Sequence, residues 1–334
     1  MAIVVDDFEI TGWPPAAVAR AKSELQSTWD MTDLGPLRYF TSVQIEHDMT
    51  ARTTTLKQTE CIENILAKYN MSDTYGKHTP CTASIYNQKL LDPVTPHAPA
   101  FGNNYRNIVG SLGYLRRTRP DICVALGVSA QYAKMGRHGP QHYRGLRNII
   151  RYCKQTMHHG LLYRSTHKKL HDPWELSAHV DSDWATWKAT RRSRTGYLIF
   201  LGLNLIAFGS RLQSAVALSS AEAEYMALSY VTRLLLWITN IIEGIPGQFI
   251  RRPVIVREDN KPCINLADNY AASKYTRHIG ICHHFLRDHY RSGNKQFKLV
   301  WTKSSSQKVD GMTKPLPRAN FITFRDYVVS DHSC

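Results

Sequence analysis

The segment from His179 to Glu224 constrains the fold more than any other part of the chain. It reads as a strand that ends in acidic residues, a basic run, two apolar strands joined tightly near Gly202, and a helix that carries Glu224. Consecutive strands with short connections favour antiparallel neighbours, and later strands that are separated by helices join such a sheet through crossovers. We therefore expect an α/β fold with a mixed sheet and flanking helices in the C-terminal half.

Isolated carboxylates recur along this half of the chain. Asp181 and Asp259 each follow a predicted strand, whereas Glu224 and Asp310 lie in the first turns of predicted helices. Acidic residues at the strand ends of an α/β sheet point into the crevice where ligands bind. Four carboxylates at one centre would suit a two-metal phosphodiester hydrolase. No local motif brings the four residues together, so dispersed surface acids are an equally good interpretation of the pattern alone.

The charge balance favours a polyanionic partner. Over 334 residues the formal net charge is +15, although a basic surface that only confers solubility is the alternative. On one predicted helix the cations follow 3, 4, 3 spacing and form a stripe without interleaved acids: Arg144, Arg147, Arg151 and Lys154. A phosphate backbone would relieve their repulsion, and a solvated face is the other interpretation. Arg191 and Arg192, in the basic run after Asp181, are further candidate nucleic-acid contacts.

Cysteine spacing and hydropathy indicate the cellular compartment in which the protein is expected. Seven cysteines without a C-x-x-C pair argue against a disulfide framework or a zinc ribbon, and they fit a reducing compartment. No apolar run approaches the roughly 18 residues of a membrane span, and the N-terminus lacks a signal-peptide pattern. We expect an intracellular protein, in a cytoplasmic particle or the nucleus, that is not secreted and has no membrane partner.

The N-terminal half predicts small elements and helices. The first twelve residues read as a hairpin with Asp6 and Asp7 at its tip, which is a weak metal-site signal because Asp-Asp is also an ordinary turn. The patterns that follow predict a helix over 14–31 with Val18, Leu25 and Trp29 on one side, a strand over 37–48 with a hairpin partner, a helix over 59–69, a connector over 71–102, and three helical segments over 103–156.

The chain resembles the C-terminal part of the polyprotein of copia-type long-terminal-repeat retrotransposons. The resemblance is carried, in order, by HVDSDWA, TRRSRTGYLIFLG, SSAEAEYMAL, REDN, RHIGICHHFLRD and VDGMTKPLPR, and upstream by VVDDFEITG, MTDLGPLRYFTSVQIE, YRNIVGSLGYLRRTRPDICVAL and GLLYRS. It covers nearly the whole chain. It implies a reverse-transcriptase palm remnant and the start of the thumb over 1–78, a helical thumb or connection region over 79–165, and a ribonuclease H-like domain over 166–334.

The resemblance also implies an activity and its residues. The family's acid set matches Asp181, Glu224, Asp259 and Asp310, with Asp183 as the less favoured first aspartate and Glu222 as the less favoured glutamate. The implied cofactor is a pair of Mg²⁺ ions, with Mn²⁺ as an alternative. The implied reaction is endonucleolytic hydrolysis of the RNA strand of an RNA–DNA hybrid, in which the protein reads backbone shape and the 2′-OH rather than sequence.

Some residues depart from the family's pattern. Val4 replaces the aromatic residue before Asp6 and Asp7, and in the family the fingers and upstream palm lie ahead of this motif. We therefore expect no polymerase activity unless another chain supplies that half. Gly280 and Cys282 stand where the family usually has an acid and an arginine. Two functions follow: an active ribonuclease H, or an inactive or repurposed retroelement remnant that binds nucleic acid without cleaving it.

Overall fold

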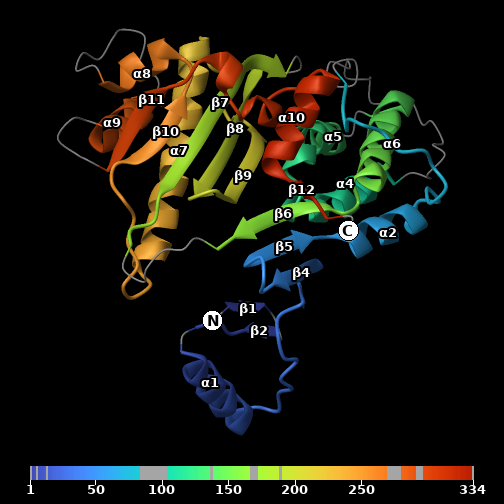
Figure 1. Cartoon of the computed structure of the whole chain (residues 1–334). Coiled ribbons are helices and arrows are strands. Elements are labelled where there is room, and N and C mark those ends of the chain that lie inside the picture. Colours follow the sequence, from blue (N-terminus) through green and yellow to red (C-terminus); the bar gives the residue numbers. More distant parts are fainter. Residues whose placement is uncertain are drawn as a thin grey trace.

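The computed structural model describes residues 2–4, 7–12, 14–82, 104–135, 138–165, 172–187, 190–268, 280–290 and 296–332. The strands of this part of the chain form two five-stranded sheets and one two-stranded hairpin. Helices pack on the two large sheets, and an N-terminal arm lies apart from them (Figure 1). The chain is mixed α/β, as the sequence predicts.

The C-terminal sheet has the strand order β11-β10-β7-β8-β9. The first three of these strands along the chain, β7, β8 and β9, are antiparallel neighbours, and β10 and β11 join beside β7 in parallel. The bounds are β7 Leu176–Trp187, β8 Arg192–Leu201, β9 Asn204–Leu212, β10 Val254–Glu258 and β11 Phe297–Trp301. This order and these directions confirm the predicted ribonuclease H-like mixed sheet.

Tight turns and a bulge shape this sheet. Leu201 of β8 pairs with Asn204 of β9, so the predicted hairpin turns through two residues, and Gly202 adopts a φ of 61° that favours glycine. The pairing of β7 with β8 shifts between Asp183 and Trp187, where Ala185 has a φ of 53°. Because α7 packs on one face of this sheet and the rest of the chain on the other, the central residues of β7 are buried.

Helix α7 (Ser220–Glu243) covers one face of the C-terminal sheet (Figure 1). Its inward side chains recur at helical spacing and are fully buried: Tyr225, Leu228, Val231 and Leu235. They share a core with residues of β7, β8 and β10, and with α8 (Lys261–Asp268) and α9 (Gly280–Tyr290). This packing explains why the helix is apolar over most of its length.

The length of α7 corrects one sequence-based expectation. It is the one described helix that is long and apolar enough to cross a membrane by length and composition, and 56% of the relevant window is buried. The statement that no apolar run approaches a membrane span is therefore wrong for α7. Its apolar side chains pack against β7 and β8.

The opposite face of the C-terminal sheet packs against the rest of the chain. Leu198, Phe200 and Leu205 belong to a second core that contains the central helices and the last helix. These helices are α4 Tyr105–Tyr114, α5 Cys123–Met135, α6 Pro140–Gln155 and α10 Arg318–Val328. Short 3-10 turns between α4 and α5 occupy the predicted break near Arg119, so the three predicted helical segments are confirmed.

The second sheet has the order β12-β6-β5-β4-β3 and draws strands from distant parts of the chain. Its bounds are β3 Tyr39–Phe40, β4 Val43–Asp48, β5 Thr53–Lys57, β6 His159–Arg164 and β12 Ser330–Asp331. The last strand pairs with β6, which pairs with β5. Strands from all three predicted domains thus share one sheet, and the division into three units stays a prediction.

The hairpin before α2 differs in one detail from its prediction. Residues 37–48 do not form one strand, because Thr41 and Ser42 take positive φ values of 47° and 65° and turn the chain between β3 and β4. The pairing of β4 with β5 and the helix α2 (Thr59–Lys68) are confirmed. The predicted apolar face of α2 is buried, as expected.

The N-terminal arm is the least packed described part. Strand β1 (Ala2–Val4) pairs with β2 (Asp7–Glu9), which confirms the hairpin, while Asp6 lies outside the described residues. Helix α1 (Pro15–Thr28) is described throughout and buries none of its residues, and Trp29 beside it is 56% exposed. Figure 1 shows this arm extending away from both large sheets. The predicted connector lies outside the described residues from position 83 to its end.

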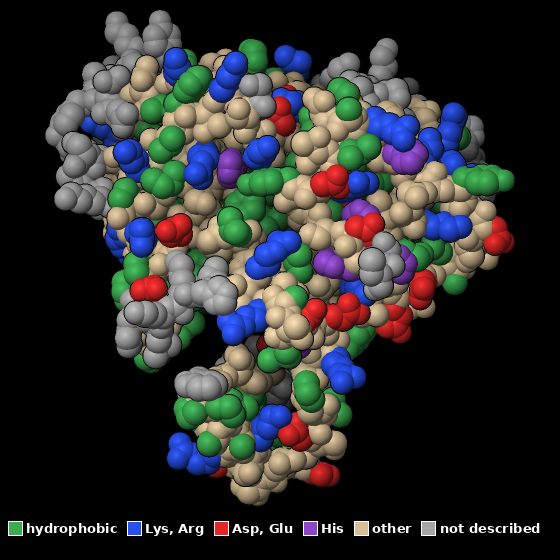
Figure 2. Space-filling view, viewed as in Figure 1, with side chains coloured by type: hydrophobic (Ala, Val, Ile, Leu, Met, Phe, Trp, Pro, Cys, Tyr) green, Lys and Arg blue, Asp and Glu red, His purple; other side chains and the backbone are tan. Residues whose placement is uncertain are grey.

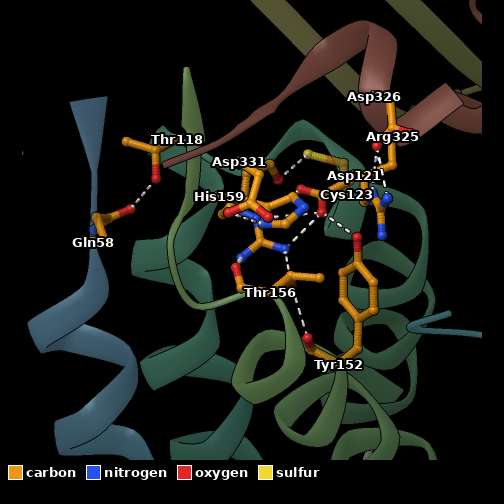
Figure 3. A network of polar contacts seen from close by, with 11 residues as sticks. Gln58, Thr118, Asp121, Cys123, Tyr152, Thr156, His159, Arg325, Asp326 and Asp331 are labelled. Atoms are coloured by element: carbon orange, nitrogen blue, oxygen red, sulfur yellow. Dashed lines mark hydrogen bonds and ion pairs between the residues drawn. The ribbon is translucent and has the colours of Figure 1, made fainter. Parts of the chain in front are cut away.

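A buried ion pair links the 3-10 turn before α5 to the end of α6 (Figure 3). Arg119 and Asp121 are both buried, with Arg119 Nη2 at 2.7 Å from Asp121 Oδ2. Tyr152 donates its hydroxyl to the same carboxylate, and Arg119 donates to the backbone and side-chain oxygens of Thr156 at 2.9 and 2.6 Å. Burial raises the pKa of Asp121, but the charge of Arg119 and these hydrogen bonds outweigh it and leave that pKa below its usual value.

Candidate metal centre

Asp181 does not follow a strand, as predicted, but lies within the central strand β7, which continues to Trp187, and it is only 5% exposed. It pairs across the sheet with Gly196, and a Cβ at Gly196 would lie 2.6 Å from the side chain of Thr313. The glycine therefore lets the segment after β11 approach the strand closely. This approach brings the Thr313 hydroxyl to Asp181, to which it donates a hydrogen bond.

Glu224 lies one turn inside α7. It differs from the nearby Glu222 in that Glu222 takes part in the cap of this helix. The Ser219 hydroxyl accepts a hydrogen bond from the Glu222 backbone at 3.2 Å, and the Glu222 carboxylate accepts one from the Leu218 backbone at 2.8 Å. This arrangement is close to a capping box. Glu222 is thereby engaged at the helix start, while the Glu224 side chain is buried toward the sheet.

Asp259 follows β10, which runs parallel to β7. Arg257 of β10 pairs with His179 of β7, so Asp259, two residues farther along, comes level with Asp181. The backbone of Asp259 is held by the neighbouring strand: Trp301 donates its indole N–H to the Asp259 carbonyl at 3.0 Å.

The three carboxylates converge. Ligand oxygens of Asp181, Glu224 and Asp259 all lie within 4.8 Å of one another. Glu224 Oε2 is buried and has no hydrogen-bond partner among the described residues. A free, buried oxygen within a set of carboxylate donors fits a hard divalent cation such as Mg²⁺, which prefers oxygen ligands. Asp183, the alternative first aspartate, is not part of this group.

Burial and mutual repulsion shift the protonation of these groups. Burial raises the pKa of Asp181 to about 6, aided by the charges of Asp310 and Asp259 and opposed by Thr313 and Lys314. The pKa of Glu224 is raised well above its usual value by burial and by the neighbouring acids. Carboxylates whose ionised forms are disfavoured in this way would be stabilised by a bound cation.

Asp310 lies at the edge of this group. It begins the 3-10 turn Asp310–Met312, and its carboxylate is 3.3 Å from Lys314 Nζ. Burial and the charge of Asp259 raise its pKa, against the effect of Lys314. The structure therefore brings three of the four predicted acids together, with the fourth near enough to influence Asp181 electrostatically. Their roles in catalysis stay predictions.

Several known proteins are similar to this chain in sequence. The reverse transcriptase (RNA-dependent DNA polymerase) family matches residues 1–83. The Pol polyprotein from transposon RE1 of Arabidopsis thaliana is 32% identical over 97% of this chain and 21% of that protein. An uncharacterized mitochondrial protein of the same plant is 35% identical over 71% of this chain and 93% of that protein.

The chain belongs to the copia-type retrotransposon Pol family. It spans about a fifth of the length of the RE1 polyprotein. Among solved structures, LC11-RNase H1 in complex with an RNA/DNA hybrid matches with a TM-score of 0.31 and 13% identity, over 42% of this chain and 94% of that one.

One buried acid of this copia-type Pol chain was not predicted from the sequence. Glu258, at the end of β10, is fully buried, and its Oε1 accepts a hydrogen bond from the Asn260 backbone at 3.1 Å. Its Oε2 has no partner among the described residues, and its charge helps to raise the pKa of Glu224. The signal was available in the alternation of β10, since Val254, Val256 and Glu258 share the buried face.

The predicted basic stripe on α6 divides into two pairs. Arg144 and Arg147 are exposed. Arg151 donates to the Tyr75 carbonyl at 2.6 Å, and Lys154 donates to the Thr74 carbonyl at 2.8 Å. The second pair therefore has an intramolecular role that the spacing did not reveal: it anchors the segment after α2.

Other cations of the copia-type Pol chain are widely distributed. Arg191 is exposed with a φ of 56° beside the start of β8, and Arg192 begins that strand. Lys and Arg side chains are spread over the visible face rather than gathered in one patch (Figure 2). The assignment of both arginines to nucleic-acid binding stays a prediction.

Proposed function

We propose that the chain is a metal-dependent ribonuclease H that hydrolyses the RNA strand of RNA–DNA hybrids. The observation that carries the proposal is the convergence of Asp181, Glu224 and Asp259 within 4.8 Å, where β7, β10 and α7 of a ribonuclease H-like fold meet. Membership of the copia-type Pol family supports the nucleic-acid substrate. The net charge of +15 supports a polyanionic partner.

In this proposal the three clustered carboxylates hold two Mg²⁺ ions, with Mn²⁺ as an alternative, and Asp310 contributes from the edge. Such ions, when bound, supply an activated water and stabilise the leaving oxygen of the phosphodiester. The chain's own residues prepare the site. Thr313 orients Asp181 through its hydroxyl, and the Trp301 indole fixes the backbone that carries Asp259.

Burial around the site contributes to selectivity. Because Asp181 and Glu224 are almost fully buried, their carboxylates are held in place by the surrounding core rather than by solvent-exposed rotamers. A fixed group of oxygens favours small, oxygen-preferring divalent ions over softer metals. We propose that the substrate contacts the exposed rim and reads backbone shape and the RNA 2′-OH.

The test is cleavage of a hybrid in which the RNA and DNA strands carry different labels. The full chain is the material of choice, because α10 and β12 pack into the core formed by the central helices and β6. Reactions contain Mg²⁺, Mn²⁺ or a chelator. The proposal predicts internal cuts in the RNA strand alone, and their loss with chelator. Folded protein that leaves both strands intact with either metal refutes it.

A second function is favoured by the position of Asp310. Its carboxylate pairs with Lys314 and lies outside the three-residue group. The fourth acid is thus engaged, and Gly280 and Cys282 replace the acid and the arginine that are usual in the family. These features fit an inactive or repurposed remnant that binds nucleic acid. Tight hybrid binding without cleavage in the same assay supports this function over the first.

A further inference from the structure

Trp301 occupies an unusual position beside the carboxylates. It is the last residue of β11, an edge strand, and it pairs in register with Glu258. Its indole N–H is committed to the Asp259 carbonyl, yet the residue remains 47% exposed. The ring is thus fixed in orientation and still presents much of its surface to solvent. Ordered and exposed indole surface next to a polar site is typical of a binding surface rather than of a core.

A cation lies over this ring. Lys261, the first residue of α8, places its Nζ 4.5 Å from the centre of the Trp301 ring and is itself exposed. Lys303, two residues beyond Trp301, is exposed as well. Lys261 follows Asp259 by two residues, so its positive charge lies near one member of a group of carboxylates that would otherwise repel a phosphodiester chain. The surface formed by Trp301, Lys261 and Lys303 therefore combines an aromatic ring with positive charges, which phosphate requires.

We propose that Trp301 and Lys261 form a nucleotide-binding subsite next to the metal centre. The indole face packs against a base or sugar of the bound strand, and the Lys261 ammonium pairs with an adjacent phosphate. Aromatic rings accept any base because every base has a π-face, so this contact positions the strand without reading its sequence. The inference rests on the proposed function, since it assumes a nucleic-acid substrate.

The indole has two contacts that must be separated. Its N–H holds the backbone of Asp259. If this is its only role, Trp301 is a positioning residue, and substitutions of Trp301 lower kcat. Its ring surface, by contrast, acts on the substrate and changes Kd and KM. Phenylalanine keeps a ring but lacks the N–H, whereas leucine lacks both. Comparing Trp301→Phe with Trp301→Leu therefore distinguishes the two contacts.

The experiment measures binding of a fluorescently labelled RNA–DNA hybrid to the full chain in Ca²⁺ over a range of salt concentrations. Trp301→Leu should weaken binding about tenfold, within the range of losing one stacked base. Trp301→Phe should retain most of the affinity. Lys261→Gln should reduce the slope of log Kd against log salt by about one, as expected for one phosphate contact. The matched control is Trp237→Leu, a tryptophan on α7 that is 60% exposed, and it should bind as the unchanged chain does.

The outcomes separate this inference from the proposed function. Binding of both Trp301→Leu and Lys261→Gln at the affinity and slope of the unchanged chain overturns the subsite, even where cleavage proceeds normally. Equal weakening by Trp301→Phe and Trp301→Leu also overturns it, because the loss would then follow the N–H group. If the unchanged chain binds but does not cleave, and the variants weaken as expected, the subsite stands while the ribonuclease proposal fails. Absence of any hybrid binding by the folded chain refutes both.

Discussion

Two buried polar clusters in this chain have opposite charge balance. Around Arg119, one guanidinium faces one carboxylate, and the hydroxyls of Tyr152 and Thr156 complete the hydrogen bonding. Around Asp181, carboxylates gather against one another, and Lys314 acts only from the edge. The first cluster lowers the pKa of its acid and the second raises it. Similar burial therefore gives opposite results, depending on the sign of the nearest charge.

The charge balance of a buried polar cluster indicates whether the cluster is structural or functional. A buried ion pair whose atoms are all hydrogen-bonded is complete within the protein, so its removal harms the fold. A buried group of like charges with an unpartnered oxygen is complete only when a cation is added, so its removal harms binding and chemistry instead. Replacing one residue of each cluster should therefore have different effects.

Asp181→Asn should have the largest effect, on activity. Replacing the central carboxylate with an amide removes charge that would pair with the ions, so we expect metal-dependent cleavage to fall by about a hundredfold or more. Without divalent ions the variant should unfold at the same or a higher temperature, because one repulsive charge is gone. Asp183→Asn is the control and should cleave nearly normally. Unchanged cleavage by Asp181→Asn and by Asp259→Asn would contradict the site.

Arg119→Met should have the opposite effect: it should lower the free energy of unfolding. It leaves Asp121 buried without its cation, and breaking a buried pair in this way costs about 3–5 kcal/mol. Urea unfolding should show the loss directly. Arg251→Met is the control, since Arg251 and Glu175 form an exposed pair at 3.6 Å and such pairs contribute about 1 kcal/mol or less. A loss below about 1 kcal/mol for Arg119→Met would show that the ion pair is not a main support of the fold.

The pH dependence of stability should also differ between the clusters. The folded-state pKa of Asp181 is about 6 against an ordinary 3.8. Its stabilising contribution is therefore complete below pH 4 and lost as the pH rises toward 6, by about 3 kcal/mol at most. Asp121 has a lowered pKa, so its contribution is present at neutral pH and lost as the pH falls.

Chemical unfolding of the metal-free chain between pH 4 and 7 checks this sign, with Asp181→Asn as the comparison that isolates Asp181. The variant should lack the loss of stability between pH 4 and 6. Divalent ions should suppress the same loss in the unchanged chain, because they bind the ionised form. Identical pH profiles for the unchanged chain and the variant would contradict the raised pKa.

The smallest effect concerns the basic stripe of α6. Arg144→Gln with Arg147→Gln should reduce the salt slope of hybrid binding by about two, because each exposed contact to phosphate contributes about one. Arg151→Gln with Lys154→Gln should leave the slope unchanged and reduce stability by about 1–3 kcal/mol through lost bonds to the Tyr75 and Thr74 carbonyls. Equal slopes for the two double variants would remove the distinction between the pairs.

Some parts of the site were accessible from the sequence and others were not. The cap of α7 is recognisable from Ser219 and Glu222, because a local spacing determines it. The position of Asp259 followed from the end of a recognisable strand. Glu258 was missed because the adjacent aspartate matched the family's motif, although the alternation of β10 placed its side chain on the buried face. The anchoring role of Lys154 could not be predicted, because its partner is a backbone carbonyl distant in sequence.

Local sequence patterns predicted the antiparallel neighbours of the C-terminal sheet, the helices around it and the acids available to a metal centre. These features depend on periodicity and on short connections, which are local properties of the chain. Three features emerge only in the folded chain: which acids meet, the position of Asp310 at the edge beside Lys314, and the return of the last strand to β6. Those outcomes depend on long-range packing, where close approach at Gly196 and burial of like charges are set by residues far apart along the chain.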